Sequence, residues 1–309
     1  MNLKKPKFWL KKNLISYIIF PLSIITYANN FIKKFVNKKK FKIRTICIGN
    51  IYVGGTGKTS LSIEINQILK KKFKTVFIKK DYSNQIDEIN LLKKNGKVIF
   101  KKERIESLEF AQKKKIEIAI LDDGLQQKNI KYDLKIVCFN ASELYGNKFL
   151  LPAGPLRESL NEIKNYDIVF LNGKNKNKNK SFFKEIKSIK NNIEIFEGIY
   201  YPENLKNFIK SKNYLMFCGI GNPHEFEKTL LEYKFKIKKK YIFGDHYKMS
   251  NEEINSIKKF SKKNKLQLIT TEKDYLRLSP TQRIGIKYLK INIKIKNLKK
   301  FKKIISRVL

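Results

Sequence analysis

Eight residues near the start of the chain have the types and spacing that bind the phosphates of a nucleotide. Residues 52–59 read Y-V-G-G-T-G-K-T, and the three glycines leave backbone N–H groups that no side chain covers. Lys58 is expected to reach the β- and γ-phosphates, and the Thr59 hydroxyl is expected to bind Mg²⁺. The stretch therefore predicts a phosphate loop formed by Tyr52, Val53, Gly54, Gly55, Thr56, Gly57, Lys58 and Thr59.

The flanking residues predict the strand and the helix that such a loop needs. An apolar, β-branched run at 43–48 precedes it, and a helical pattern with Leu61, Ile65 and Ile68 follows it. The positive end of that helix dipole would face the phosphates. Tyr52 replaces the first glycine of the usual G-x-x-x-x-G-K-[ST] pattern, so a chance glycine-rich turn is the alternative. The patterns on both sides favour the phosphate loop.

Further charged residues follow apolar runs or a stiff loop. The predicted strand at 116–121 leads directly into Asp122 and Asp123, followed by glycine. Taken alone, this sequence indicates an Asp-Gly turn, whereas beside a phosphate loop it favours a Mg²⁺-binding carboxylate. A loop at 150–156 with two prolines presents Arg157 and Glu158, for which a cleft pair and a surface ion pair are both open.

The chain has two histidines that are candidates for acid–base chemistry. His224 lies at a predicted helix start, and His246 follows a glycine and an aspartate just after a strand. An isolated histidine is more often structural than catalytic. The titration range of imidazole makes His246 the better acid–base candidate of the two.

Strands and helices alternate along most of the chain, which is typical of an α/β fold with a mostly parallel sheet flanked by helices. Strands are predicted at 43–48, 75–78, 97–100, 116–121, 134–139, 214–220, 241–243 and 266–270. The low-complexity stretch 172–180 is expected to be a solvated loop between two lobes. We expect a membrane-associating segment at 1–40, a P-loop domain at 41–175, and a smaller α/β domain at 176–309 that closes the substrate cleft.

The uncharged stretch 13–32 lies between lysine clusters and indicates contact with a membrane. A signal peptide is disfavoured because the region around Ala28 is a poor cleavage site. A spanning helix is disfavoured because serine, threonine, asparagine and proline dilute the apolar run. An interfacial helix fits best, with aromatic residues such as Trp9 at headgroup depth and the lysines on anionic lipid.

The chain is strongly basic, with 68 Lys and Arg against 27 Asp and Glu and a formal net charge of +41. Such a protein meets anionic partners, including phospholipid surfaces, nucleotides, nucleic acid and phosphorylated substrates, and charge alone does not choose among them. Cys47, Cys138 and Cys218 lie in apolar runs without C-x-x-C spacing. This indicates buried, reduced thiols in a cytosolic compartment.

Six stretches, in the same order, resemble the tetraacyldisaccharide 4′-kinase family of lipid A biosynthesis. They are G-N-I-Y-V-G-G-T-G-K-T (49–59), D-D-G-L-Q-Q (122–127), G-N-K-F-L-L-P-A-G-P-L-R-E (146–158), G-I-G-N-P-H-E-F (219–226), D-H-Y (245–247) and T-T-E-K-D (270–274). Together they extend over the chain from about residue 40 to 275. The family also carries an amino-terminal membrane-associating segment.

The resemblance implies an enzyme that transfers the γ-phosphoryl group of ATP, with Mg²⁺, to an alcohol. The acceptor would be the 4′-hydroxyl of an acylated disaccharide 1-phosphate. The expected place of action is the cytoplasmic face of the inner membrane, where the protein would be peripheral or monotopic on an anionic surface. Nucleic acid is not an expected partner.

The resemblance also implies roles for individual residues. The catalytic aspartate of the family's G-D-E motif matches Asp87, which would accept the proton of the sugar hydroxyl, and His246 would orient that carboxylate. The positions near Mg²⁺ are Thr59, Asp122 and Glu158. The positions near phosphates and substrate are Arg104, Arg157, Asp123 and Gln126.

The chain departs from the family pattern between residues 79 and 88. The family's S-R-G-Y-G is K-K-D-Y-S at 79–83, without the arginine and both glycines, and the segment that follows is short. The glycine of the G-D-E motif is Ile86. Asp81 is therefore the alternative to Asp87 as the catalytic carboxylate.

Two other classes of protein remain open on the residues alone. One is a P-loop ATPase or GTPase that binds nucleic acid through its basic surface, for which the amino-terminal apolar segment has no use. The other is a membrane-tethered nucleotide sensor that binds ATP without turning it over. An assay for a 4′-phosphorylated product separates the kinase from both.

Overall fold

The computed structural model describes residues 6–81, 86–173 and 176–307, which form two compact units. The P-loop unit contains residues 6–81, 95–173, 176–200 and 293–307. The second unit contains residues 86–94 and 201–292. Each unit is built on a mostly parallel sheet with helices, which confirms the predicted α/β class.

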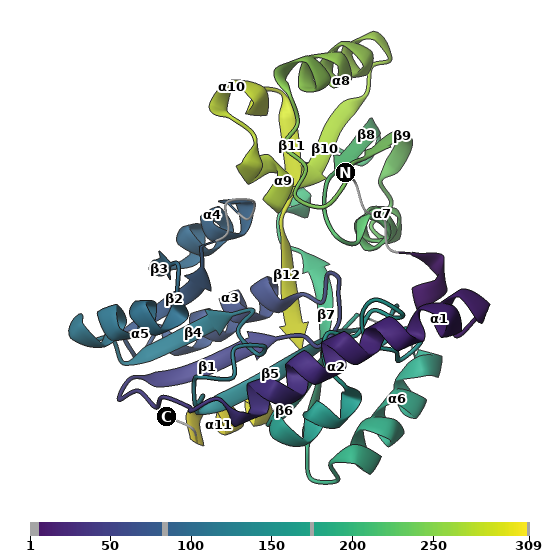
Figure 1. Cartoon of the computed structure of the whole chain (residues 1–309). Helices are drawn as coiled ribbons and strands as arrows, with labels where there is room; N and C mark the ends of the chain where they lie inside the picture. Colours follow the sequence, from purple (N-terminus) through teal and green to yellow (C-terminus); the bar gives the residue numbers. More distant parts are fainter. Residues whose placement is uncertain (1–5, 82–85, 174–175, 308–309) are drawn as a thin grey trace. The chain divides into compact units, whose positions relative to one another are not determined.

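The sheet of the P-loop unit has the strand order β12-β7-β6-β5-β1-β4-β2-β3 (Figure 1). From β3 to β7, neighbouring strands are parallel. The register sets Ile48 level with Asp122, so the phosphate loop and the acidic pair leave the same edge of the sheet. The strands are β1 (Arg44–Gly49), β2 (Thr75–Lys80), β3 (Val98–Lys101), β4 (Ile118–Asp122), β5 (Leu134–Asn140), β6 (Ile168–Asn172), β7 (Glu194–Pro202) and β12 (Ile291–Ile295).

Helices cover this sheet, and for this reason its central strands are mostly apolar, with polar residues near their ends. Every residue of β4 and β6 is buried, which is typical of parallel strands covered on both faces. Phe301 on the last helix packs edge-on against Phe170 and Phe196 of the sheet. The helices are α3 (Lys58–Leu69), α5 (Arg104–Lys113), α6 (Lys176–Ile189) and α11 (Leu298–Arg307).

The second unit has a parallel sheet in the order β11-β10-β8-β9. Its strands are β8 (Asn213–Cys218), β9 (Lys236–Ile242), β10 (Gln267–Thr271) and β11 (Ile286–Leu289). Its helices are α7 (Pro223–Glu232), α8 (Asn251–Lys263), α9 (Glu272–Arg277) and α10 (Pro280–Arg283), together with α4 (Ile86–Asn95), which comes from the middle of the P-loop unit's sequence. Cys218, like Cys47 and Cys138, is a buried free thiol, as expected.

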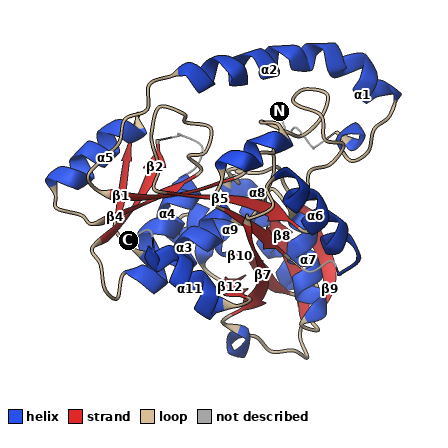
Figure 2. Cartoon of the chain, turned by 90° about the horizontal axis from the view of Figure 1, so that it is seen from below, coloured by secondary structure: helices blue, strands red, loops and turns tan. Residues whose placement is uncertain are grey.

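The amino-terminal segment is helical and belongs to the P-loop unit. After η1 (Lys7–Trp9), the elements α1 (Leu14–Ile19), η2 (Phe20–Leu22), α2 (Ser23–Ile32) and η3 (Lys33–Phe35) follow one another as a helical arm (Figure 2). Leu14–Phe35 spans 22 residues and is long and apolar enough to cross a membrane by length and composition, with 11% of its most apolar window buried.

The expected boundary between the lobes at 175/176 is wrong. Residues 176–200 and 293–307 belong to the P-loop unit because β7 and β12 extend its sheet. Residues 86–94 belong to the second unit, although they precede more than half of the P-loop unit in sequence. Sheet edges are completed by strands from distant parts of the chain, and such pairing leaves no local signal.

The loop expected at 172–180 is also wrong in part. Residues 174–175 lie outside the described residues, and α6 begins at Lys176. Its apolar positions Phe182 and Ile186 are fully buried, and this burial stabilises a helix that the Asn-Lys composition does not suggest.

Candidate active site

The phosphate loop follows β1 and ends at the first turn of α3. Gly57 is the N-cap of α3 with φ of 79°, a left-handed conformation that glycine adopts without strain. A Cβ atom at this position would clash with the side chains of Asn172 and Tyr200. Glycine is therefore required at residue 57 for both its backbone angle and its lack of a side chain.

Three asparagines at the carboxyl ends of strands hold the loop by its carbonyl oxygens. Asn50 donates to the carbonyls of Tyr52 (2.7 Å) and Gly54 (3.3 Å). Asn140 donates to the carbonyl of Gly55 (3.3 Å), and Asn172 donates to the carbonyl of Thr56. Because the C=O and N–H of a peptide group point in opposite directions, this arrangement turns N–H groups of the loop away from the strands.

These asparagines were not predicted as site residues. Their signal in the sequence is their position, because each lies directly after an apolar strand or at its last residue. A polar side chain there reaches the same sheet edge as the phosphate loop.

Lys58 lies among polar groups that can keep its ammonium in place. Its Nζ is 3.1 Å from Asn50 Oδ1 and 3.4 Å from Asp123 Oδ1, and Arg157 Nη1 is 3.7 Å from the same carboxylate oxygen. Burial raises the pKa of Asp123, but the charges of Lys58 and Arg157 outweigh it and lower that pKa below its usual value. Asp123 is therefore an ionised counter-ion for two cations beside the loop.

Thr59 and Asp122 bring together two oxygen donors of the kind that Mg²⁺ prefers. Thr59 Oγ1 donates to Asp122 Oδ2 at 3.2 Å, and Ser62 Oγ donates to Oδ1 at 3.3 Å. Lys79 Nζ also lies 2.8 Å from Asp122 Oδ2, and this buried ion pair was not predicted. A hydroxyl and a carboxylate fit Mg²⁺ because this ion takes few protein ligands and completes its shell with phosphate and water.

Glu158 and Arg104 have partners of their own. Glu158 is buried and pairs with Lys128 (2.5 Å) and Tyr166 (2.7 Å). The guanidinium of Arg104 donates to the backbone carbonyl of Asp123 (2.5 Å), so it supports the acidic turn. The role of Glu158 at the metal and that of Arg104 at a phosphate stay predictions.

Gln126 links the acidic turn to the phosphate loop. Its Nε2 donates to the carbonyl of Asn50 at 2.7 Å and lies 3.4 Å from Glu158 Oε2. The turn after β4 is thus tied to the residues that precede the loop, and the substrate role of Gln126 stays a prediction.

In the second unit, Asp87 and His246 are in contact, as their pairing predicted. His246 Nδ1 lies 3.1 Å from Asp87 Oδ1, and Arg277 Nη2 donates to Asp87 Oδ2 at 2.8 Å. Arg277 Nη1 also contacts Asp274 Oδ1 at 2.9 Å, so one guanidinium joins two carboxylates. Asp87 is 1% exposed and His246 is 22% exposed at the side chain, so histidine is the solvent-facing member.

Arg277 and Asp274 are functional candidates that the sequence did not reveal. Asp274 ends the T-T-E-K-D stretch, but Arg277 lies outside every quoted motif. One helical turn separates them on α9, and this spacing is the local signal that links Arg277 to the motif.

The network sets the charge state of the pair. Burial raises the pKa of Asp87, but the hydrogen bond from His246 and the charges of Lys273 and Arg277 outweigh it and lower that pKa to about 2. The hydrogen bond to Asp87 raises the pKa of His246 above its usual value, against the opposing effect of burial. Near neutral pH the carboxylate is therefore ionised, and its hydrogen bond favours the protonated form of His246.

A stability difference that depends on pH follows from the raised pKa of His246. Its ion pair with Asp87 stabilises the fold below the unfolded-state pKa of about 6.5 and is lost as pH rises through the folded-state pKa. We expect the free energy of unfolding of H246Q to be about 1 kcal/mol below that of wild type at pH 5.5. At pH 9 the two free energies should be closer. Thermal melts at both values check this, and an equal gap at both would contradict the charge-based explanation.

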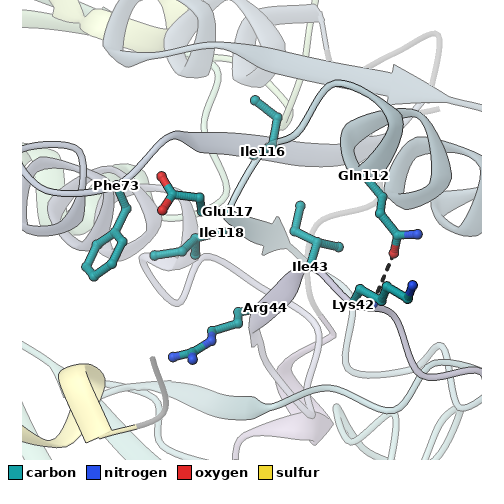
Figure 3. A pocket seen from close by; sticks show the side chains of 8 residues that line it. All are labelled: Lys42, Ile43, Arg44, Phe73, Gln112, Ile116, Glu117 and Ile118. Carbon is teal, nitrogen blue, oxygen red and sulfur yellow. Dashed lines mark hydrogen bonds between the residues drawn. The ribbon is translucent and has the colours of Figure 1, made fainter.

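A separate pocket of about 320 Å³ opens at the opposite edge of the large sheet (Figure 3). Lys42 and Arg44 at the start of β1, and Glu117 and Ile118 at the start of β4, contribute to its lining. The phosphate loop follows the other end of β1, so this pocket contributes no group to it.

Comparison with known proteins gives a consistent result. Residues 15–309 match the family described as Tetraacyldisaccharide-1-P 4′-kinase. The tetraacyldisaccharide 4′-kinase of Pelagibacter ubique is 47% identical over 301 residues, covering 96% of this chain and 95% of that protein. That of Rickettsia bellii is 34% identical over 316 residues, covering 96% of each chain.

A solved structure supports the fold. LpxK from Aquifex aeolicus, crystallised in complex with ATP, superposes with a TM-score of 0.73 at 23% identity. The match covers 96% of this chain and 99% of that one.

Proposed function

The chain belongs to the tetraacyldisaccharide-1-P 4′-kinase family, and we propose that its phosphate loop and its Asp87–His246 pair carry out that family's reaction. The protein is an ATP-dependent phosphotransferase of lipid A biosynthesis. It transfers the γ-phosphoryl group of ATP to the 4′-hydroxyl of a tetraacyldisaccharide 1-phosphate and gives the 1,4′-bisphosphate. The observation that carries the assignment of the site is the loop at 52–59, which the three strand-end asparagines hold by its carbonyls.

The P-loop unit binds the nucleotide. The N–H groups of the loop and of the start of α3 donate hydrogen bonds to phosphate oxygens, and Lys58 supplies a positive charge beside them. Thr59 and Asp122 would hold Mg²⁺, which neutralises developing charge on the phosphates when bound. In this role the Lys79 ammonium, which contacts Asp122 Oδ2, balances the charge of that carboxylate.

The second unit receives the proton of the acceptor hydroxyl. The sugar oxygen forms a bond to the γ-phosphorus, the bond from that phosphorus to the β–γ bridging oxygen breaks, and ADP leaves with the electron pair. The hydroxyl proton goes to the Asp87–His246 pair. Arg277 and His246 each occupy one oxygen of Asp87, and a carboxylate oxygen can accept a further hydrogen bond.

The family acts in lipid A synthesis at the membrane, and the amino-terminal arm supports contact of this chain with an anionic surface. Apolar side chains along it are largely exposed: Leu14, Ile15, Ile18, Leu22, Ile24, Ile25, Phe31 and Ile32. Its polar residues Ser16 and Ser23 are buried against the protein. A helix whose polar side is bonded to the rest of its unit lies on a bilayer more readily than it crosses one, which favours a monotopic enzyme. The family resemblance is the reason for proposing the cytoplasmic face.

The test is a product assay with purified full-length protein, ATP, Mg²⁺ and the acylated disaccharide 1-phosphate. We expect a 4′-phosphorylated product and flotation with anionic vesicles that weakens in high salt. RNA-stimulated ATP hydrolysis without that product would support the nucleic-acid-binding class instead, and ATP binding without turnover would support the sensor.

A further inference from the structure

The helical arm presents its polar side chains to the protein and its apolar ones outward. The least exposed positions of α2 are Ser23, Thr26 and Asn30, which recur at intervals of three and four residues and so share one face. We call these three residues the inner stripe. This orientation is the reverse of that of an ordinary surface helix, which buries its apolar face.

Each residue of the inner stripe donates a hydrogen bond to the backbone of one loop. Ser23 Oγ donates to the carbonyl of Leu150 (2.9 Å) and Thr26 Oγ1 to that of Leu151 (2.8 Å). Asn30 Nδ2 donates to the carbonyl of Arg157 at 2.7 Å. The three bonds bracket residues 150–157, which we call the bridging loop.

The other side of the bridging loop is bonded to the residues that lead into the phosphate loop. The N–H of Val53 donates to the carbonyl of Pro155 (2.9 Å), and the N–H of Arg157 donates to the carbonyl of Ile51 (2.7 Å). Tyr52 and Leu156 form an antiparallel bridge between these bonds. Arg157 therefore has its carbonyl on the helix, its N–H on residue 51, and its guanidinium beside Asp123.

We propose that the inner stripe positions the phosphate loop: α2 holds the bridging loop, and the bridging loop holds residues 51–53. The helical arm thereby supports ATP binding in addition to contacting the membrane. Ser23, Thr26 and Asn30 touch no reacting group in this scheme and act as positioning residues. The inference rests on the proposed role of residues 52–59 in binding ATP.

Adjacent asparagines on α2 provide a matched test. Asn30 is bonded to the bridging loop, whereas Asn29 is exposed on the same helix. In full-length protein we expect N30A to raise the Kd for ATP about fivefold, which corresponds to about 1 kcal/mol for one hydrogen bond. N29A should bind ATP like wild type, and both variants should float with anionic vesicles to the same extent.

Calorimetric titration with ATP and vesicle flotation are the measurements, and the KM for ATP should rise more than kcat falls. T26V removes one hydroxyl at nearly constant volume and should weaken ATP binding, whereas T26S keeps the hydroxyl and should restore it. This pair also covers the case in which N30A does not fold. ATP affinities of N30A and T26V equal to wild type would overturn the proposal, whereas a wild-type protein that binds no ATP would overturn the proposed function itself.

Discussion

Replacement of Lys58 by alanine is expected to lower kcat/KM for ATP by about 10³-fold. In the proposed site its ammonium lies beside the phosphates of the nucleotide, and its side chain is only 15% exposed. A charge in a poorly solvated site stabilises developing negative charge much more than it would in water. Steady-state rates of 4′-phosphorylated product at varied ATP concentration measure the effect.

The control is K71A, because Lys71 is an exposed lysine just after α3 in the same unit. K71A removes the same charge from the protein as a whole, but Lys71 lies outside the phosphate loop. This variant should therefore retain wild-type rates. K58R keeps the charge but replaces a compact ammonium with a planar fork and should recover only part of the activity. A K58A enzyme with near wild-type kcat/KM would show that residues 52–59 do not bind the transferred phosphate.

Replacement of Asp87 by asparagine is expected to lower kcat by about 10²- to 10⁴-fold, the range that general-base catalysis contributes. The substitution keeps the size of the side chain and removes its charge, so the bonds to His246 and Arg277 lose their ionic partner. The companion variant D81N tests the alternative carboxylate, which is exposed. A large loss in D81N with wild-type turnover in D87N would reverse the assignment.

The pH dependence of kcat/KM distinguishes which member of the pair takes the proton. With its pKa at about 2, Asp87 is ionised throughout the range from pH 5 to 8, so a profile governed by Asp87 has no acidic limb there. If His246 takes the proton, activity falls as pH drops below the raised pKa of that histidine. H246Q should abolish such an acidic limb. Substitution of Arg277, which donates to Asp87, should lower kcat without shifting the pH of that limb.

The phosphate loop could be predicted because its chemistry is local. Bare backbone, a lysine, a hydroxyl and a helix start must be consecutive, so residues 52–59 carry the whole signal. The position of Asp122 beside this loop could be predicted for a similar reason, since the end of one buried strand lies beside the end of the next in a parallel sheet. The pairing of Asp87 with His246 came from family resemblance, not from spacing.

Other contacts could not be predicted because they join residues that are distant in sequence. Arg277 reaches Asp87 across 190 positions, and Lys79 reaches Asp122 from a neighbouring strand. β7 and β12 extend the sheet that contains β1, and residues 176–200 and 293–307 therefore belong to the P-loop unit. Such choices depend on which surfaces pack together, and a single sequence carries no period or turn that reports them.

The amino-terminal arm combines both cases. The sequence alone determined that residues 13–32 are apolar and lysine-flanked, because length and composition decide whether a helix can enter a bilayer interface. Only the tertiary structure decided that the serine, threonine and asparagine within it face inward. In the sequence these polar groups dilute an apolar run, but in the folded protein they donate to three carbonyls of one loop. A carbonyl 127 residues away leaves no signal in the sequence of the helix that binds it.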